Sequence, residues 1–214
     1  MEEYITITQN ETTEITEKKS KFIADLYYVE NAEQVEEKII EIKKKYYDAR
    51  HHCIAYRYVQ GNQVIEKSSD DGEPSGTAGA PMLNILQKNN LCNILVIVTR
   101  YFGGILLGTG GLVRAYSEAT QKAIEQSKLV TKIKGIEAEV KLDYSNLESF
   151  KYFCRNNNVK IVNVEYLEDV VLKIEMENNV KNIILNKIET KTLNIKKIEV
   201  LREKFINKTV EKNK

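Results

Sequence analysis

The pattern of apolar residues changes at about residue 134, and this change divides the chain into two parts. Beyond it we expect an alternating strand at 136–142, a helix, strands at 159–166 and 170–177, a helix at 180–191 and a strand at 195–201. This β-α-β-β-α-β order is typical of the ferredoxin-like fold. The sequence therefore predicts a C-terminal ferredoxin-like domain over 134–214, with a capping box of Ser145 and Glu148 and a frayed end from Arg202 onward.

The first part, 1–130, is predicted to be an α+β domain of its own, so the fold class is α+β with two domains. A helix should begin at the cap Asn31, with Gln34 three residues later, and end near Tyr47. The segment 93–99 is apolar without alternation, which is typical of a strand buried on both faces at the centre of a sheet. The other expected elements are strands at 4–8, 12–15, 21–29, 53–59 and 63–67 and helices around 82–87 and from 112 to about 127.

The composition indicates a soluble globular protein and excludes other classes. Of the 214 residues, 42% are hydrophobic and 29% are charged, which is the balance of a soluble globular protein. No apolar run approaches the roughly 18 residues that span a bilayer, and the N-terminal segment MEEYITITQN is unlike a signal peptide, so we expect a cytoplasmic protein without a membrane partner. The three cysteines form no CxxC pair and are expected to be reduced thiols.

The charge is close to balanced, with a formal net charge of +1. Residues 1–130 contain 15 basic and 18 acidic side chains, whereas residues 131–214 contain 17 and 13. Bulk charge therefore cannot drive binding to nucleic acid, and any such binding needs a local basic patch. The lysine-rich second part, 131–214, is expected to contribute to such binding.

Glycine is concentrated in one region, because all ten glycines lie between Gly61 and Gly135. The segment GGILLGTGGLVRAYS, 103–117, places five of them immediately before a helix. A helix N-terminus flanked by glycines can bind an anion through its free N–H groups, although tight loop packing explains the same glycines equally well. The candidate anion-binding residues are Gly108, Thr109, Gly110 and Gly111.

A second glycine-containing segment, SSDDGEPSGTAGAP, carries carboxylates and hydroxyls over 68–81. Its carboxylates could hold Mg²⁺ or act as a base, but the same residues are also good turn formers. We favour a loop that contacts a ligand over a metal site, and we expect no cofactor. The candidate residues are Asp70, Asp71, Glu73, Ser75 and Thr77.

The two histidines precede a cysteine, as His51, His52 and Cys53. Neighbouring residues on a strand point to opposite faces, so these three side chains cannot surround one zinc ion. We favour a buried cysteine beside a hydrogen-bonding histidine over a catalytic Cys–His pair, and we expect neither a metal site nor catalytic residues.

Three arginines lie in or beside these segments, with tyrosines close to them in the sequence. Arg57, Arg100 and Arg114 are predicted to form one anion-binding surface, because arginines among aromatic side chains are typical of RNA-binding surfaces. The alternative is ion pairing with Asp70, Asp71 or Glu73.

Four segments, KKSKFIA, DARHHCIAYRY, DDGEPSGTAGAPM and VTRYFGGILLGTGGLVRAYS, resemble in this order the IMPACT (YigZ) family. In residues 18 to about 127 the likeness rests on sequence motifs. In the remaining residues it rests only on the pattern of the predicted ferredoxin-like domain. Ile54 and Leu106 depart from the motifs, since an aromatic residue and a lysine are common there, and the missing lysine weakens the case for anion binding. The resemblance implies a first domain folded like domain IV of elongation factor G, a ferredoxin-like second domain, and a link to translation, because eukaryotic relatives regulate initiation.

These observations lead to one favoured function and two alternatives. We expect a non-enzymatic, cytoplasmic RNA- or ribosome-associated binding protein with a role in translation regulation. The first alternative is a regulator of translation or of a stress response that acts through a protein partner. The second is a small enzyme that uses Asp70, Asp71 or His51 on a phosphorylated metabolite. The sequence leaves the oligomeric state open.

Overall fold

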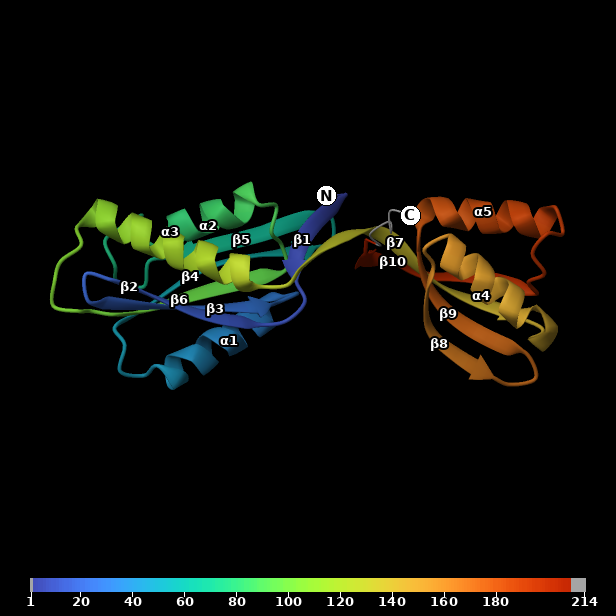
Figure 1. Cartoon of the computed structure of the whole chain (residues 1–214), viewed down its shortest axis with the longest axis horizontal. Helices are drawn as coiled ribbons and strands as arrows, with labels where there is room; N and C mark the ends of the chain where they lie inside the picture. The colour runs from blue at the N-terminus through green and yellow to red at the C-terminus, as the bar shows by residue number, and fades with distance from the viewer. Residues whose placement is uncertain (1, 209–214) are drawn as a thin grey trace. The chain divides into compact units, whose positions relative to one another are not determined.

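The computed structural model describes residues 2–208, and Figure 1 shows that they form two compact units. The first unit covers residues 3–130 and the second begins at Thr131. Each unit combines one sheet with helices, so the expected two-domain α+β fold is confirmed. Within residues 2–208, no helix is both long and apolar enough to cross a membrane.

The first unit is built on a five-stranded sheet in the order β2-β3-β6-β4-β5, in which all neighbours are antiparallel. The central strand is β6, as predicted from its unbroken apolar run. The elements are β1 (Glu3–Ile7), β2 (Glu11–Glu17), β3 (Ser20–Tyr28), α1 (Ala32–Lys45), β4 (His51–Gln60), β5 (Gln63–Ser69), α2 (Gly79–Lys88), β6 (Ile94–Tyr101) and α3 (Thr109–Gln126).

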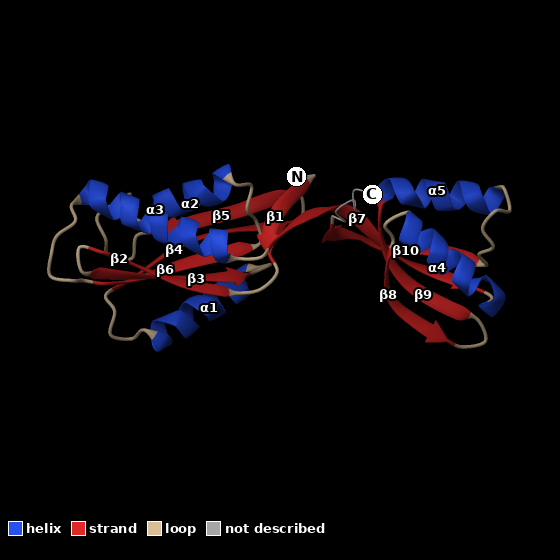
Figure 2. Ribbon diagram, viewed as in Figure 1, coloured by secondary structure: helices blue, strands red, loops and turns tan. Residues whose placement is uncertain are grey.

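Helices cover both faces of this sheet, with α2 and α3 on one side and α1 on the other (Figure 2). Val96 and Val98 of β6 belong to the core beneath α2 and α3, whereas Leu95 and Ile97 belong to the core beneath α1. Because both of its faces are buried, β6 has no polar side to alternate with.

Local signals explain where two of the helices begin. The side chain of Asn31 accepts a hydrogen bond from the Gln34 N–H at 2.9 Å, which confirms the predicted cap of α1. Helix α3 begins earlier than expected, at Thr109, so Gly110 and Gly111 lie in its first turn instead of in the preceding loop. Gly108 serves as its N-cap residue with φ +72°, a conformation that favours glycine.

The second unit has the predicted β-α-β-β-α-β order. Its sheet runs β10-β7-β9-β8 with antiparallel neighbours, and the residues buried beneath the two helices form one apolar core. The elements are β7 (Leu129–Leu142), the short 3-10 helix η1 (Tyr144–Asn146), α4 (Leu147–Asn156), β8 (Lys160–Tyr166), β9 (Val170–Glu177), α5 (Asn178–Glu189) and β10 (Lys197–Asn207).

Two predictions for the second unit were wrong. Residues 202–207 are not frayed, because they continue β10 and pair with residues 132–137 of β7; the expected frayed residues after Lys208 lie outside the described part. The capping box is not formed, since Ser145 lies within η1 and the residue that precedes α4 is Asn146, which makes no side-chain cap.

Candidate functional site at one edge of the first sheet

Four connections of the first unit meet at one edge of its sheet, at the left of Figure 1. They are the β2–β3 turn at 18–19 and the loops 46–50, 70–78 and 102–108. Strand register brings them together, because His51 pairs with Arg100 and Lys21 pairs with Tyr101. We call these four connections, with the strand ends that carry them, the loop edge. It contains His51, Arg100 and every candidate residue of the 68–81 segment.

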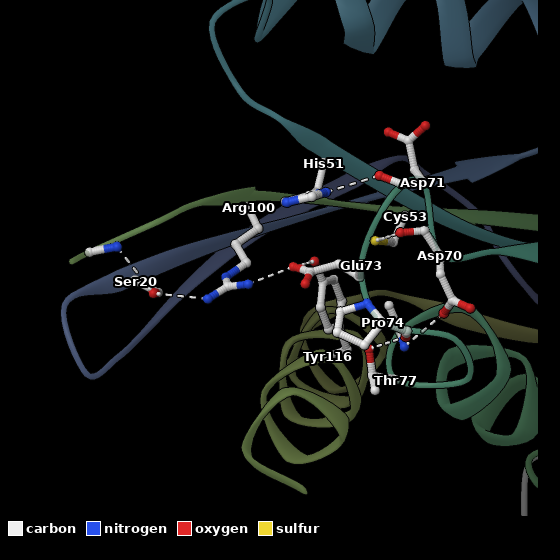
Figure 3. A network of polar contacts seen from close by, with 12 residues as sticks. Ser20, His51, Cys53, Asp70, Asp71, Glu73, Pro74, Thr77, Arg100 and Tyr116 are labelled. Atoms are coloured by element: carbon white, nitrogen blue, oxygen red, sulfur yellow. Dashed lines mark hydrogen bonds and ion pairs between the residues drawn. The ribbon is translucent and has the colours of Figure 1, made fainter. Parts of the chain in front are cut away.

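A buried network of polar side chains lies at the centre of the loop edge (Figure 3). Arg100 Nη1 donates to Glu73 Oε1 at 2.7 Å, and the Tyr116 hydroxyl donates to the same oxygen at 2.8 Å. Glu73 and Arg100 are 8% and 7% exposed, and Tyr116 is fully buried. The ion pair that was the alternative interpretation of these residues is therefore present, and it removes most of both charged side chains from solvent.

Asp70 stabilises the start of α2. The residue before this helix is Ala78, whose side chain cannot cap, and Asp70 Oδ1 accepts instead from the N–H groups of Ala78 and Gly79, at 2.9 and 2.8 Å. Asp70 Oδ2 accepts from the Gly76 N–H at 2.8 Å. Burial opposes the charged form, but together these three donors hold the pKa of Asp70 below its ordinary value.

Asp71 connects the two histidines to the loop. The ring of His51 donates through Nδ1 to the Asp71 carbonyl at 2.9 Å, and the backbone N–H of His52 donates to the Asp71 carboxylate at 2.7 Å. Lys43 Nζ lies 3.2 Å from the same carboxylate. The ring of His52 donates through Nε2 to the Tyr46 carbonyl at 3.1 Å, and its Nδ1 lies 3.7 Å from the Asp71 carboxylate.

Cys53 is buried, as predicted, and its thiol donates to the Asp70 carbonyl at 3.0 Å (Figure 3). Burial raises the pKa of this thiol to about 12, so it carries almost no thiolate at neutral pH. Within residues 2–208, no three side chains of His, Cys, Asp or Glu are grouped so that they could hold a metal ion.

The hydroxyls of the loop have different surroundings. Thr77 is buried and donates to the Pro74 carbonyl at 2.6 Å, which closes a turn. Ser75 is exposed on the surface of the same loop.

The three arginines do not form one surface, so that prediction was wrong. Arg57 pairs with Ile94 of β6, whereas Arg100 pairs with His51, which places Arg57 and Arg100 about six residues apart along β6, or roughly 20 Å. The Arg57 side chain donates to Glu66 at 2.9 Å and to the carbonyls of Leu86 and Leu91. Arg114 is exposed on α3 and does not line the cleft described below.

The glycines of the 103–117 segment have unequal roles. A Cβ on Gly110 would meet no atom within 4 Å, so no steric reason requires glycine there. A Cβ on Gly111 would lie 2.9 Å from the Leu107 Cβ, whereas one on Gly103 would lie 2.0 Å from the carbonyl carbon of Lys19. Gly103 was missed because nothing in the local sequence indicates the close approach of the β2–β3 turn.

A cleft of about 680 Å³ opens at the loop edge. Phe102 and Leu106 at its border are 55% and 82% exposed, and the Tyr101 hydroxyl donates to Asp48 at 2.7 Å. Arg50 and Phe102 were not among the predicted site residues, although both lie inside the motifs quoted above. The lining residues are Asp48, Ala49, Arg50, His51, Arg100, Tyr101, Phe102 and Leu106.

Cations at the loop edge remain available to a partner. Lys18, Lys19 and Arg50 are exposed, and among the described residues none of their side chains forms a hydrogen bond or an ion pair. In the second unit, Lys196, Arg202 and Lys204 pair with acidic side chains.

Two family models match this chain. The Impact N-terminal domain matches residues 18–124, and a domain of unknown function, DUF1949, matches residues 140–189. The IMPACT family member YvyE of Bacillus subtilis is 36% identical over 179 residues, which cover 84% of this chain and 82% of that protein. The chain belongs to the IMPACT family. The resemblance inferred from its motifs is therefore confirmed, and the match to the Impact N-terminal domain includes the whole loop edge.

Two further comparisons cover most of the chain. The IMPACT family member YigZ of Escherichia coli is 36% identical over 162 residues, covering 74% of this chain and 78% of that protein. A crystal structure titled as that of a hypothetical protein is 30% identical, covers 94% of this chain and 98% of its own, and superimposes with a TM-score of 0.61. The two-unit architecture is thus shared with a solved structure.

Proposed function

We propose that this IMPACT family protein is a cytoplasmic, non-enzymatic regulator of translation that binds RNA or a ribosomal RNA surface at the loop edge. The link to translation that the family resemblance implies supports the regulatory role. The RNA-binding role rests on one observation, that the exposed Arg50 lines a cleft with an exposed aromatic ring, Phe102, while the exposed Lys18 and Lys19 lie in the β2–β3 turn of the same loop edge.

The local charge supports this proposal despite the acidic balance of residues 1–130. Asp70 accepts three backbone N–H groups, Asp71 accepts from His52 and Lys43, and Glu73 is neutralised by Arg100. These three acidic side chains are thus engaged by donors of the protein, and the exposed Asp48, which lines the cleft, accepts from the Tyr101 hydroxyl, while the cations face solvent. A phosphate backbone is attracted by such a local field.

The chemistry of the site supports a binding role over catalysis. Cys53 is a buried thiol rather than a thiolate, Asp70 accepts from three backbone N–H groups, and Glu73 Oε1 accepts from Arg100 and Tyr116. A general base or nucleophile needs a reactive group within reach of its substrate. His51 is the histidine that lines the cleft, and one of its ring nitrogens is engaged by Asp71.

The salt dependence of RNA binding tests this proposal. The affinity for a labelled single-stranded RNA should fall linearly with salt on logarithmic axes, and each phosphate interaction that Lys18→Ala/Lys19→Ala or Arg50→Ala removes should reduce the slope by about 0.7. The matched control is Lys67→Ala/Lys88→Ala, two exposed lysines outside the loop edge, which should keep the wild-type slope. Equal slopes in all four proteins would refute RNA binding at the loop edge.

A protein partner is the second candidate, and the apolar side chains at the border of the cleft favour it. Ile105 and Leu106 are 43% and 82% exposed, and exposed apolar groups are typical of protein-binding surfaces. In that case RNA affinity should stay weak and non-specific. Leu106→Asp should then abolish recovery of the partner from nuclease-treated lysate, whereas Leu129→Asp, at another exposed leucine, should not.

A further inference from the structure

We propose that Phe102 is a stacking platform for one unpaired RNA base and that Arg50 contacts the phosphate beside that base. This inference rests on the proposed function, since it names the part of the RNA that the cleft accepts. It is carried by the exposure of Phe102, by the rigidity of its surroundings and by the chemistry of the cleft.

The backbone on both sides of Phe102 is held in place. Tyr101 is the last residue of β6, and its hydroxyl donates to Asp48. On the other side, the Gly103 N–H donates to Ser20 Oγ at 3.2 Å, and Gly103 packs so closely on the β2–β3 turn that no side chain fits there. An aromatic ring between two fixed residues loses little freedom when a ligand binds it.

Arg100 lies over the ring of Phe102. Its guanidinium carbon is 5.7 Å from the centre of that ring and 5.5 Å from the centre of the Phe22 ring. Arg100 cannot move away easily, because Glu73 binds it inside the protein. Phe102 is therefore backed by a fixed cation, yet it remains 55% exposed, so part of the ring is free for a flat group.

The cleft has the size and the polar groups that a nucleotide needs. Its volume of about 680 Å³ lies in the range of small-ligand sites. Arg50 supplies an unpaired guanidinium for phosphate. His51 donates through Nδ1 to Asp71, which leaves Nε2 for the edge of a base.

Charge favours RNA over an apolar peptide as the occupant. Among the described residues, Arg50 lines the cleft with Phe102 and has no partner, and Lys18 and Lys19 of the same loop edge have none either, so a nucleotide can satisfy the cation and the ring at once. An apolar peptide would leave the cations without partners. The base must be unpaired, because a base within a duplex offers its faces only to its neighbours.

Tryptophan fluorescence provides a direct test, because the chain contains no tryptophan. Phe102→Trp should bind a uridine octamer about as tightly as the wild type, and its fluorescence should be quenched on binding. Phe102→Leu should bind about tenfold more weakly, in line with the loss of one stacked base, with the salt slope of the wild type. The matched control is Tyr152→Leu, which removes a 63% exposed ring on α4, outside the loop edge, and should keep wild-type affinity.

The outcomes separate this inference from the proposed function. If the wild type shows no salt-dependent binding of the octamer, the proposed function itself fails. If the wild type binds but Phe102→Leu binds equally well and Phe102→Trp is not quenched, the stacking inference is overturned while RNA binding stands. Unchanged melting temperatures ensure that a loss in Phe102→Leu reports on stacking, and the quenching of Phe102→Trp gives the same answer without a loss-of-function variant.

Discussion

Glu73 and Arg100 form a 2.7 Å ion pair whose side chains are only 3% and 7% exposed. The pair joins the loop 70–78 to the end of β6. The Tyr116 hydroxyl of α3 donates to Glu73, so α3 is linked to the pair as well. Two charges removed from water are tolerated only when each satisfies the other. The buried Glu73 carboxylate and the buried Arg100 guanidinium therefore depend on one another. The loop edge is thus held together by a contact that fails if either charge is removed.

Glu73→Ala should destabilise the first unit by about 3–5 kcal/mol, because it leaves the buried Arg100 charge without a partner. Glu66→Ala is the matched control. Glu66 also binds an arginine, but its side chain is 35% exposed and Arg57 keeps two carbonyl acceptors, so the cost should be about 1 kcal/mol or less. Urea unfolding measures both free energies, and equal losses in the two variants would contradict the importance of the buried pair.

Gly103→Ala should lower stability far more than Gly110→Ala. A methyl group at Gly103 would overlap the backbone of the β2–β3 turn, whereas one at Gly110 meets open space within a helix. Alanine is favoured over glycine in a helix by up to about 1 kcal/mol, so Gly110→Ala should leave the melting temperature unchanged or raise it. A large loss of stability in Gly110→Ala would show that the first turn of α3 has a constraint beyond its steric surroundings.

Acid should weaken the loop 70–78 through Asp70. Its pKa is lower in the folded state than its ordinary value of 3.8, so its contribution to stability is present above about pH 4 and is lost as the pH falls through the lower, folded-state pKa. Asp70→Asn should lower the melting temperature most at neutral pH, and the difference from wild type should shrink in acid. Glu118→Gln, which removes an exposed acid on α3, should show no such pattern. A difference that stays constant from pH 7 to pH 2 would contradict this account.

The three cysteines should not react with a thiol reagent in the folded protein. Cys53, Cys92 and Cys154 are all buried, and burial raises the pKa of each thiol, to about 12 for Cys53 and Cys154. Titration with Ellman's reagent at pH 8 should therefore detect almost no thiol at first and all three after denaturation. Rapid reaction of one thiol in the native protein would show that its segment opens readily.

Local patterns made most of the fold predictable. The cap at Asn31, the unbroken apolar run of β6 and the alternation in β9 each depend on residues close in the sequence. The ends of β7 and β10 were not predictable, because residues 132–135 and 204–207 are held by pairing with each other and carry few apolar side chains. Long-range pairing extends strands beyond what periodicity indicates.

The sequence motifs indicated which segments form the site, but not how their side chains are arranged in space. Glu73 and Arg100 were predicted as site residues, but their local sequence does not show whether each binds a ligand or a partner inside the protein, because that depends on strand register. Strand register also separates Arg57 from Arg100, although both arginines have tyrosines close to them in the sequence. Phe102 was overlooked because its exposure follows from the turn at Gly103, which only the folded chain reveals.

The β4–β5 hairpin lies at the opposite end of β4 from His51, and its turn contains Gly61 and Asn62. Ten residues of strand separate this turn from the loop edge, a span of roughly 30 Å. A peptide tag or a surface anchor inserted between Gly61 and Asn62 would therefore be carried on the far side of the first unit from the cleft. Such an insertion would let the protein be immobilised in one orientation with its candidate binding surface facing the solution.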